Sequence, residues 1–440
     1  MSAAKRRLGR AGAIAACVVL VGAGLLMGRN DFHLSRWISR LGTPRDSLRI
    51  AQLLYERCGR LGGEPKVACY AGPLDSVAAR GEVRVAIGTL ERIGALDRDV
   101  KRDAHVYAHG IGIAAGKRGG HVARTFAMCD ERFQSGCYHG VIQAYFAAAR
   151  TIGPAEVNAL CEPFRGPGAD RWIRFQCVHG MGHGLEMIYA HDLPKSLAGC
   201  DYLNDDWDRR SCYGGAFMEN IVNVTMPKHP AHQLETHMAA DMPGMDMSGM
   251  DHGAASAYKA VDAADPLSPC SSVAETYLVA CYEMQTSVIL YLNHGDIGAA
   301  AKTCDTAPLR MRYVCYQSLG RDISSYALQD HARSIAMCSL GTPRYRPWCY
   351  FGLVKNFIDL NARASDGLAL CRELTGEADK MKCYEAVGEQ VGTLRNDAGP
   401  RRELCAPAEP AYLDACLFGA RVSPTAPALL ARLNAEAAGG

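Results

Sequence analysis

Apolar residues recur along the chain in short blocks with helical spacing, and turns separate the blocks. Within residues 332–361 a first apolar block ends near Cys338 and Gly341. A proline-containing turn follows, and a second block then places large apolar residues at steps of three and four. This is the spacing of one buried helix face. The pattern predicts two helices joined by a short turn.

The cysteines give this pattern a period. Of the 19 cysteines, all but Cys17 fall into neighbouring pairs, and the second member is usually followed by tyrosine. The pairs are 58/69, 129/137, 161/177, 200/212, 270/281, 304/315, 338/349, 371/383 and 405/416. From Cys281 to Cys416 the second cysteines recur every 33 or 34 residues, and Tyr107 stands at the cysteine position of a further unit. The intervals predict about ten helical-hairpin repeats.

These repeats predict an all-α fold. Within most pairs the cysteines lie 11 or 12 residues apart, which favours disulfides over the shorter spacing of zinc sites. One hairpin is too small to bury its apolar face, so neighbours must stack into a solenoid, either open or curved into a ring. Unit length and cysteine placement over residues 50–420 resemble Sel1-like and cysteine-rich tetratricopeptide-type repeats. This resemblance implies stacked helix pairs with a concave binding face.

The N-terminus predicts the location of the chain. Basic residues at positions 5–7 and 10 precede an apolar stretch at 11–28. We expect an uncleaved membrane anchor rather than a removed signal peptide, with the bulk of the chain outside the cytoplasm as a single-pass protein. The expected parts are 1–30 (basic flank and anchor), 31–221 (first repeats), 222–268 (a flexible insertion), 269–425 (further repeats) and 426–440 (a tail). A net charge of +2 without long runs of one sign gives no reason to expect a nucleic acid partner.

Histidines occupy one position of the repeat. Two residues after the second cysteine, or its equivalent, three consecutive units carry His109, His139 and His179. One helical turn away lie His105 and His183, which therefore face the same way. With Glu219 of the next unit, these residues form a candidate transition-metal site, for which copper, zinc, iron and manganese all suit the ligands. The segment HGMGH at 179–183 has the spacing of zinc protease ligands but lacks their general-base glutamate.

Glycines cluster in the units that carry the histidines. Because a glycine inside a helix destabilises it by about 1 kcal/mol relative to alanine, some other interaction must offset this. Close approach of two helices and close approach of a ligand both remain open from the sequence. The glycines concerned are Gly110, Gly112, Gly140, Gly180, Gly182, Gly184, Gly214 and Gly215.

The insertion contains a second set of candidate ligands. Thioether and imidazole groups are crowded into residues 226–252, and thioether sulfur suits Cu(I). The segment resembles the Met/His-rich stretches of bacterial copper-resistance and copper-transfer proteins, which implies copper capture or delivery. An insertion without a ligand is the alternative. The candidate loop ligands are Met226, His229, His232, His237, Met238, Met242, Met245, Met247, Met250 and His252.

Three functions are compatible with these features. The first is a membrane-anchored, extracytoplasmic protein that binds or transfers a transition metal, with copper favoured. The second is a metal-dependent oxidoreductase or hydrolase with Glu219 or Glu283 as the catalytic acid or base. The third is a scaffold that binds a protein partner on its concave face and uses the histidines structurally. The sequence holds no phosphate-binding loop and no serine-nucleophile motif that would name a substrate.

Overall fold

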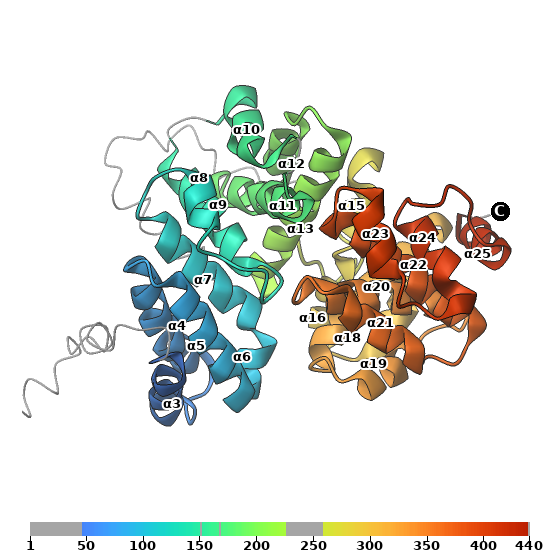
Figure 1. Cartoon of the computed structure of the whole chain (residues 1–440), viewed down its shortest axis with the longest axis horizontal. Coiled ribbons are helices and arrows are strands. Elements are labelled where there is room, and N and C mark those ends of the chain that lie inside the picture. Colours follow the sequence, from blue (N-terminus) through green and yellow to red (C-terminus); the bar gives the residue numbers. More distant parts are fainter. Residues whose placement is uncertain (1–45, 150–151, 167–168, 226–257, 439–440) are drawn as a thin grey trace, which may run out of the picture.

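The computed structural model describes residues 46–149, 152–166, 169–225 and 258–438, and the regular elements in these ranges are all helices (Figure 1). This confirms the predicted all-α class. The first half contains α3 (Ser47–Cys58), α4 (Gly63–Ala79), α5 (Val83–Leu96), α6 (Arg98–Arg102), α7 (Ala104–Gly116), α8 (Val122–Phe126), α9 (Gly136–Ala148), α10 (Pro154–Leu160), η2 (Glu162–Phe164), α11 (Arg171–Ile188), α12 (Leu193–Asp201) and α13 (Asp206–Thr225).

The second half repeats the alternation of a short first helix and a long second helix. It contains η4 (Glu275–Tyr277), α15 (Leu278–Tyr282), α16 (Gln285–Leu292), α17 (Ile297–Cys304), α18 (Leu309–Tyr326), α19 (His331–Cys338), α20 (Arg346–Asp359), α21 (Ala364–Glu373), α22 (Glu377–Leu394), α23 (Ala398–Cys405), η5 (Pro410–Tyr412), α24 (Leu413–Gly419) and α25 (Ala428–Ala438).

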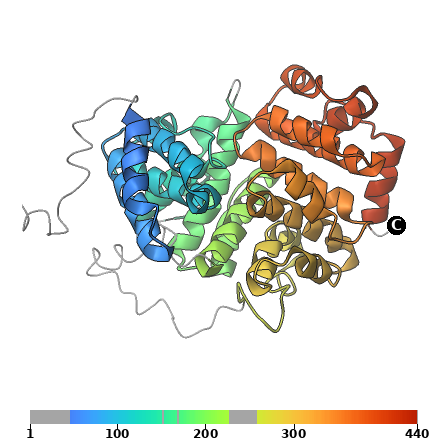
Figure 2. The same cartoon turned by 90° about the horizontal axis from the view of Figure 1, so that it is seen from below.

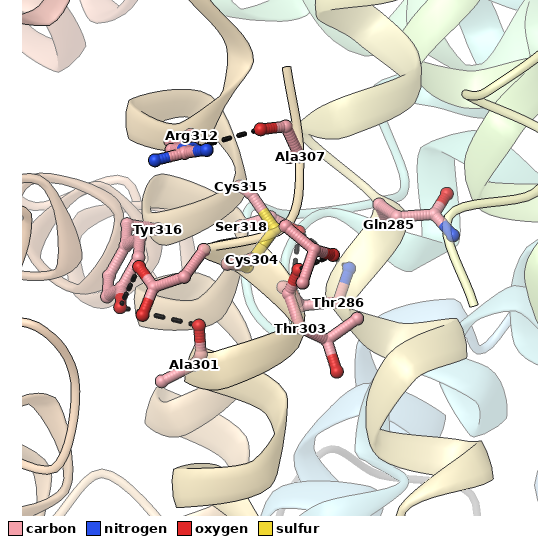
Figure 3. Close-up of a disulfide and its surroundings, with 12 residues drawn as sticks. Gln285, Thr286, Ala301, Thr303, Cys304, Ala307, Arg312, Cys315, Tyr316 and Ser318 are labelled. Carbon is pink, nitrogen blue, oxygen red and sulfur yellow. Dashed lines mark hydrogen bonds between the residues drawn. A yellow bond between two sulfur atoms is a disulfide. The ribbon is translucent and has the colours of Figure 1, made fainter. Parts of the chain in front are cut away.

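Nine disulfides fix this alternation, and they join the nine predicted cysteine pairs. Figure 3 shows one of them, in which Cys304 at the end of α17 is bonded to Cys315 in the middle of α18. The bond holds the first helix against the side of the second, where the two would otherwise share only a small apolar contact. Nine disulfides are typical of chains that fold in an oxidising compartment.

In several units the tyrosine after the second cysteine forms a second, polar link between helices. Tyr316 is fully buried, and its hydroxyl donates a hydrogen bond to Asp305 Oδ1 at 3.0 Å (Figure 3). The hydroxyl of Tyr384 donates to Glu409 Oε2 at 2.9 Å, and that of Tyr70 to Asp97 Oδ2 at 3.2 Å. Because a buried hydroxyl without a partner is unfavourable, these three tyrosines pair with an acidic group of their own unit or the next one. Tyr350 donates to Ile335 O at 3.3 Å instead, and the buried Tyr282 hydroxyl has no hydrogen-bond partner among the described residues. In these three units the Cys-Tyr dipeptide thus provides one covalent and one polar attachment.

Neighbouring second helices pack in close pairs through reciprocal glycines. In the pair α7–α9, a Cβ on Gly112 would lie 2.0 Å from Cys137 O, and one on Gly140 would lie 2.1 Å from His109 O. Only hydrogen fits there, so these glycines serve the close approach of helices. Three further pairs have the same contacts. They are α11–α13 (Gly182, Gly215), α18–α20 (Gly320, Gly352) and α22–α24 (Gly388, Gly419).

The stack of units curves back so that its two halves touch (Figures 1 and 2). Lys101, just before α7, donates to Leu328 O just after α18 at 3.2 Å. The backbone amide of Gln134, before α9, donates to Leu360 O after α20 at 3.4 Å, and Asn396 after α22 donates to Ala169 O before α11. The ends of three helices in the second half therefore meet the starts of three helices in the first. The repeats are stacked, as predicted, and the stack is strongly curved.

The predicted single-pass membrane localisation is contradicted. Among the helices in the described ranges, none has both the length and the apolar character needed to cross a bilayer. The longest of them, α13, contains charged residues at five of its 20 positions. The apolar stretch 11–28 that suggested an anchor lies outside the described residues, as does most of the predicted insertion 222–268. Of that insertion, residues up to Thr225 belong to α13, and the described chain resumes at 258.

The reciprocal glycines generate a stability prediction. We expect Gly352→Ala to lower the free energy of unfolding by about 3 kcal/mol, because its Cβ would lie 1.8 Å from Gln317 O and the helices would have to separate. Gly72→Ala in α4 is the matched control, since nothing lies within 4 Å of its Cβ, and it should raise stability by about 0.5–1 kcal/mol. Urea unfolding of the oxidised proteins measures both. Equal stability of the two variants would contradict the role of the glycine contacts.

Candidate metal centre

Four consecutive second helices of the first half contribute the predicted site residues. His105 and His109 lie on α7, His139 lies on α9, and His179 and His183 lie on α11. Glu219 lies on α13. The close glycine pairing of α7 with α9 and of α11 with α13 brings these helices near enough for side chains of adjacent units to meet.

The structure brings all five imidazole rings together. The centre of the His139 ring lies 5.3 Å from that of His109, 5.0 Å from that of His179 and 5.0 Å from that of His183. The His105 ring lies 4.6 Å from His109 and 5.5 Å from His139. His109, His139, His179 and His183 are at most 7% exposed, and His105 is half-buried. The cluster is therefore part of the protein interior.

Each ring has one nitrogen hydrogen-bonded to an oxygen acceptor. The acceptors come from backbone carbonyls, from glutamine amides and from the carboxylate of Glu219. The contacts are His105 Nδ1 to Phe133 O (2.8 Å), His109 Nδ1 to Gln143 Oε1 (3.0 Å), His139 Nε2 to Gln176 Oε1 (2.8 Å), His179 Nδ1 to Ser211 O (3.2 Å) and His183 Nδ1 to Glu219 Oε2 (2.6 Å). Since an oxygen accepts in every case, the bonded nitrogen carries the proton and the other nitrogen of a neutral ring presents a lone pair.

Two of the opposite nitrogens have no hydrogen-bond partner in the described part of the chain, and two others face each other. His139 Nδ1 and His183 Nε2 are buried and have no hydrogen-bond partner among the described residues. His105 Nε2 and His109 Nε2 face each other at 3.1 Å, although both rings already donate from Nδ1. Two nitrogens bound to one tetrahedral ion at about 2.0–2.1 Å would lie about 3.3 Å apart. A metal ion would satisfy these buried groups, which are otherwise unfavourable.

Burial also keeps the imidazoles neutral. Loss of hydration lowers the pKa of His105 and lowers those of His139 and His183 far below their ordinary value, and the neighbouring imidazoles lower the last two further. Burial, together with the charge that His105 would carry, lowers the pKa of His179 to about 4. Neutral imidazole is the form that binds a metal, so the site is ready for an ion at pH 7 without releasing protons from these rings.

The potential ligand atoms form three overlapping groups, each with its atoms within 4.8 Å of one another. The groups are His105–His109–His139, His139–His179–His183 and His109–His183–Glu219. The buried histidines and Glu219 could therefore hold a metal ion. Glu219 accepts from His183, which is the arrangement in which a carboxylate orients a metal-binding imidazole.

The other candidate residues lie elsewhere. Glu283, proposed from the sequence as a catalytic acid or base, follows α15 in the second half and belongs to none of the three groups. Burial raises its pKa, and the positive charge of Lys355 opposes this effect. The ten candidate ligands of the loop, from Met226 to His252, lie outside the described residues.

Most of the groups that orient the rings could not be identified from the sequence. Gln176 is the residue before Cys177, a position with no fixed residue type in the repeat, and Phe133 O and Ser211 O are backbone carbonyls. Gln143 could be found because it lies one turn after His139 on the same helix face. A backbone carbonyl leaves no mark in the sequence, so only the fold could reveal the roles of Phe133 O and Ser211 O.

Fold and site together define a disulfide-bonded, all-helical repeat protein with a buried histidine cluster that could hold a metal ion. No protein-family model, curated protein or solved structure matches the chain. The resemblance to known cysteine-rich repeats is thus confirmed at the level of architecture alone, as stacked helix pairs with disulfides.

The neutral rings predict a pH dependence of the metal-free protein. In the unfolded chain an imidazole has a pKa of about 6.5, and a folded-state pKa below this value means that the folded protein binds fewer protons. Protonation therefore favours the unfolded chain, and the free energy of unfolding decreases as the pH falls below about 6.5. With its pKa near 4, His179 alone should account for a loss of about 2 kcal/mol between pH 7.5 and pH 5. Urea unfolding in the presence of a chelator measures this loss. It should shrink in His179→Gln, and a wild-type stability that does not change over this range would contradict neutral buried rings.

Proposed function

We propose that this protein binds a transition-metal ion, with copper favoured, at the histidine cluster of the first half, and that it stores the ion or passes it on. One observation supports this most directly. Five clustered imidazoles from three consecutive units, four of them buried and one half-buried, each give one nitrogen to an oxygen acceptor. A buried N–H needs an acceptor in any protein core, but the second nitrogens of His139 and His183 have no partner among the described residues, and a metal ion would supply one.

The ligand chemistry favours copper. The cluster offers neutral imidazoles, which suit copper, zinc, iron and nickel, and divalent copper binds most tightly of these to a given nitrogen site. The 18 paired cysteines are all used in disulfides, so thiolates do not compete for the ion. The Met/His-rich sequence 226–252 adds soft ligands of the kind that bind Cu(I).

The burial of the cluster favours storage or transfer over catalysis. A catalytic metal usually has about three protein ligands and an open position that substrate can reach. Here each group of candidate ligands is flanked by the other imidazoles of the cluster, and His109, His139 and His183 are at most 3% exposed. Glu219, the carboxylate nearest the rings, accepts a hydrogen bond from His183. These features leave little room for a substrate beside the ion.

Removing a central ring tests the proposal. We expect the wild-type protein to retain one metal ion per chain after dialysis against a mild chelator, and His139→Ala to retain much less than one, because His139 belongs to two of the three ligand groups. Elemental analysis measures the content. His331→Ala is the matched control, since His331 lies on α19 and pairs with Glu373 at 2.7 Å, away from the cluster. Equal metal content in wild type and His139→Ala would refute the proposal.

Replacing a residue that orients a ligand, rather than the ligand itself, gives a milder test of metal binding. We expect Gln176→Leu to weaken metal binding by about 10- to 100-fold, because the amide oxygen that holds His139 Nε2 is lost while the ring remains. A competition titration with a chromophoric chelator measures the affinity. Unchanged affinity would show that His139 does not bind the ion through a ring fixed by Gln176.

Deleting residues 226–252 tests the role assigned to the loop. We expect the deletion variant to bind fewer Cu(I) ions in total and to keep the one ion of the histidine cluster, because the two ligand sets belong to different parts of the chain. Circular dichroism should show the same helix content as the wild type. Loss of the helical signal, or an unchanged copper total, would contradict a separate copper-collecting role.

A further inference from the structure

The five histidines divide into two groups of three that share one ring. His105 and His109 group with His139, and His179 and His183 group with His139. His105 and His179 fall in different groups, whereas His109 of α7 and His183 of α11 lie between them, with ring centres 5.1 Å apart and a third group shared with Glu219. The cluster is elongated along the row of helices α7, α9 and α11, with His139 in the middle.

The shared ring can bind an ion at only one atom. His139 Nε2 is 2.8 Å from Gln176 Oε1, which leaves Nδ1 as the nitrogen without a partner. A single nitrogen binds one metal ion at a time. An ion held with His105 and His109 therefore excludes a second ion that also needs His139, and the two groups act as alternative positions.

The two positions differ in depth and in charge. His105, at one end, is half-buried, whereas His179 at the other end is 7% exposed and His183 beside it is 1% exposed. Glu219 is also 1% exposed, lies 2.6 Å from His183 Nδ1, and belongs to a ligand group with His109 and His183. In a weakly polar interior, a carboxylate attracts a cation strongly. The position near His183 is therefore the more stable of the two, and the position at His105 is the more accessible.

We propose that the cluster is a two-position path for one ion, which enters at His105, His109 and His139 and then settles at His139, His179 and His183. This inference rests on the proposed metal-binding function and adds a direction to it. His139 stays bound while the ion exchanges His105 and His109 for His179 and His183, so the ion never leaves all its ligands at once. Release follows the same steps in reverse order.

The test compares the affinity for the metal ion and the rate of metal uptake in two conservative variants. His105→Gln and His183→Gln each remove one imidazole but keep a side chain that can hydrogen-bond to Phe133 O or Glu219. Metal-free protein is mixed with Cu(I) held by a chromophoric chelator under anaerobic conditions. The absorbance change gives the uptake rate, and its final value gives the affinity and the number of ions.

The proposal predicts opposite effects for the two changes. His105→Gln should take up the ion about tenfold more slowly, with an affinity within about threefold of wild type, because only the entry position is damaged. His183→Gln should bind at least about 100-fold more weakly while its initial uptake rate stays near wild type. His139→Gln should lose both properties.

Two results would overturn the two-position path while leaving metal binding intact. One is an equal loss of affinity in His105→Gln and His183→Gln, which would indicate one undivided site. The other is a wild-type uptake rate in His105→Gln, which would place the entrance elsewhere. Failure of the wild-type protein to bind Cu(I) or Zn(II) would instead reject the proposed function itself, so the two failures are distinguishable.

Discussion

The contact on which the structure depends is the approach of paired second helices at two glycines, each facing a carbonyl oxygen of the other helix. In one helix of a pair the glycine follows the cysteine position by five residues, and in the other by three, as in Gly182 and Gly215. Any side chain at these positions would push the helices apart. The disulfide sets the position of the first helix against the second, and the glycines set the distance from one unit to the next.

This spacing allows the histidines to form a centre. The carbonyl that faces Gly140 belongs to His109, and the one that faces Gly215 belongs to His179, so two of the close backbone contacts lie at ring-bearing residues. The curvature of the stack then encloses the rings, and burial keeps them neutral. In the second half the same glycine pairs occur with Gln317 and Glu385 at the equivalent carbonyls, and there Lys382 donates to Glu385. The scaffold is thus repeated, and the five clustered histidines lie in the first half.

Much of this fold could be predicted because cysteine pairs record the period of the repeat directly. Once the units are aligned, equivalent residues must point to the same side. The alignment therefore predicts from the sequence alone that His109, His139 and His179 lie together. The curvature could not be predicted, because it results from many small helix-to-helix rotations. The same holds for the contacts of Phe133 O and Ser211 O. One signal was overlooked: Asp192, Asp296 and Asp330 each stand eight residues before a first cysteine and cap the first helix of a unit.

X-ray absorption at the metal edge of the protein loaded with one equivalent of copper tests the central claim most directly. The account predicts a shell of imidazole nitrogens at about 2.0 Å with the multiple scattering typical of histidine rings, and no sulfur in the first shell. A first shell dominated by sulfur at about 2.3 Å would place the tightly held ion at thioether or thiolate ligands, and would contradict the assignment of the histidine cluster as the metal centre.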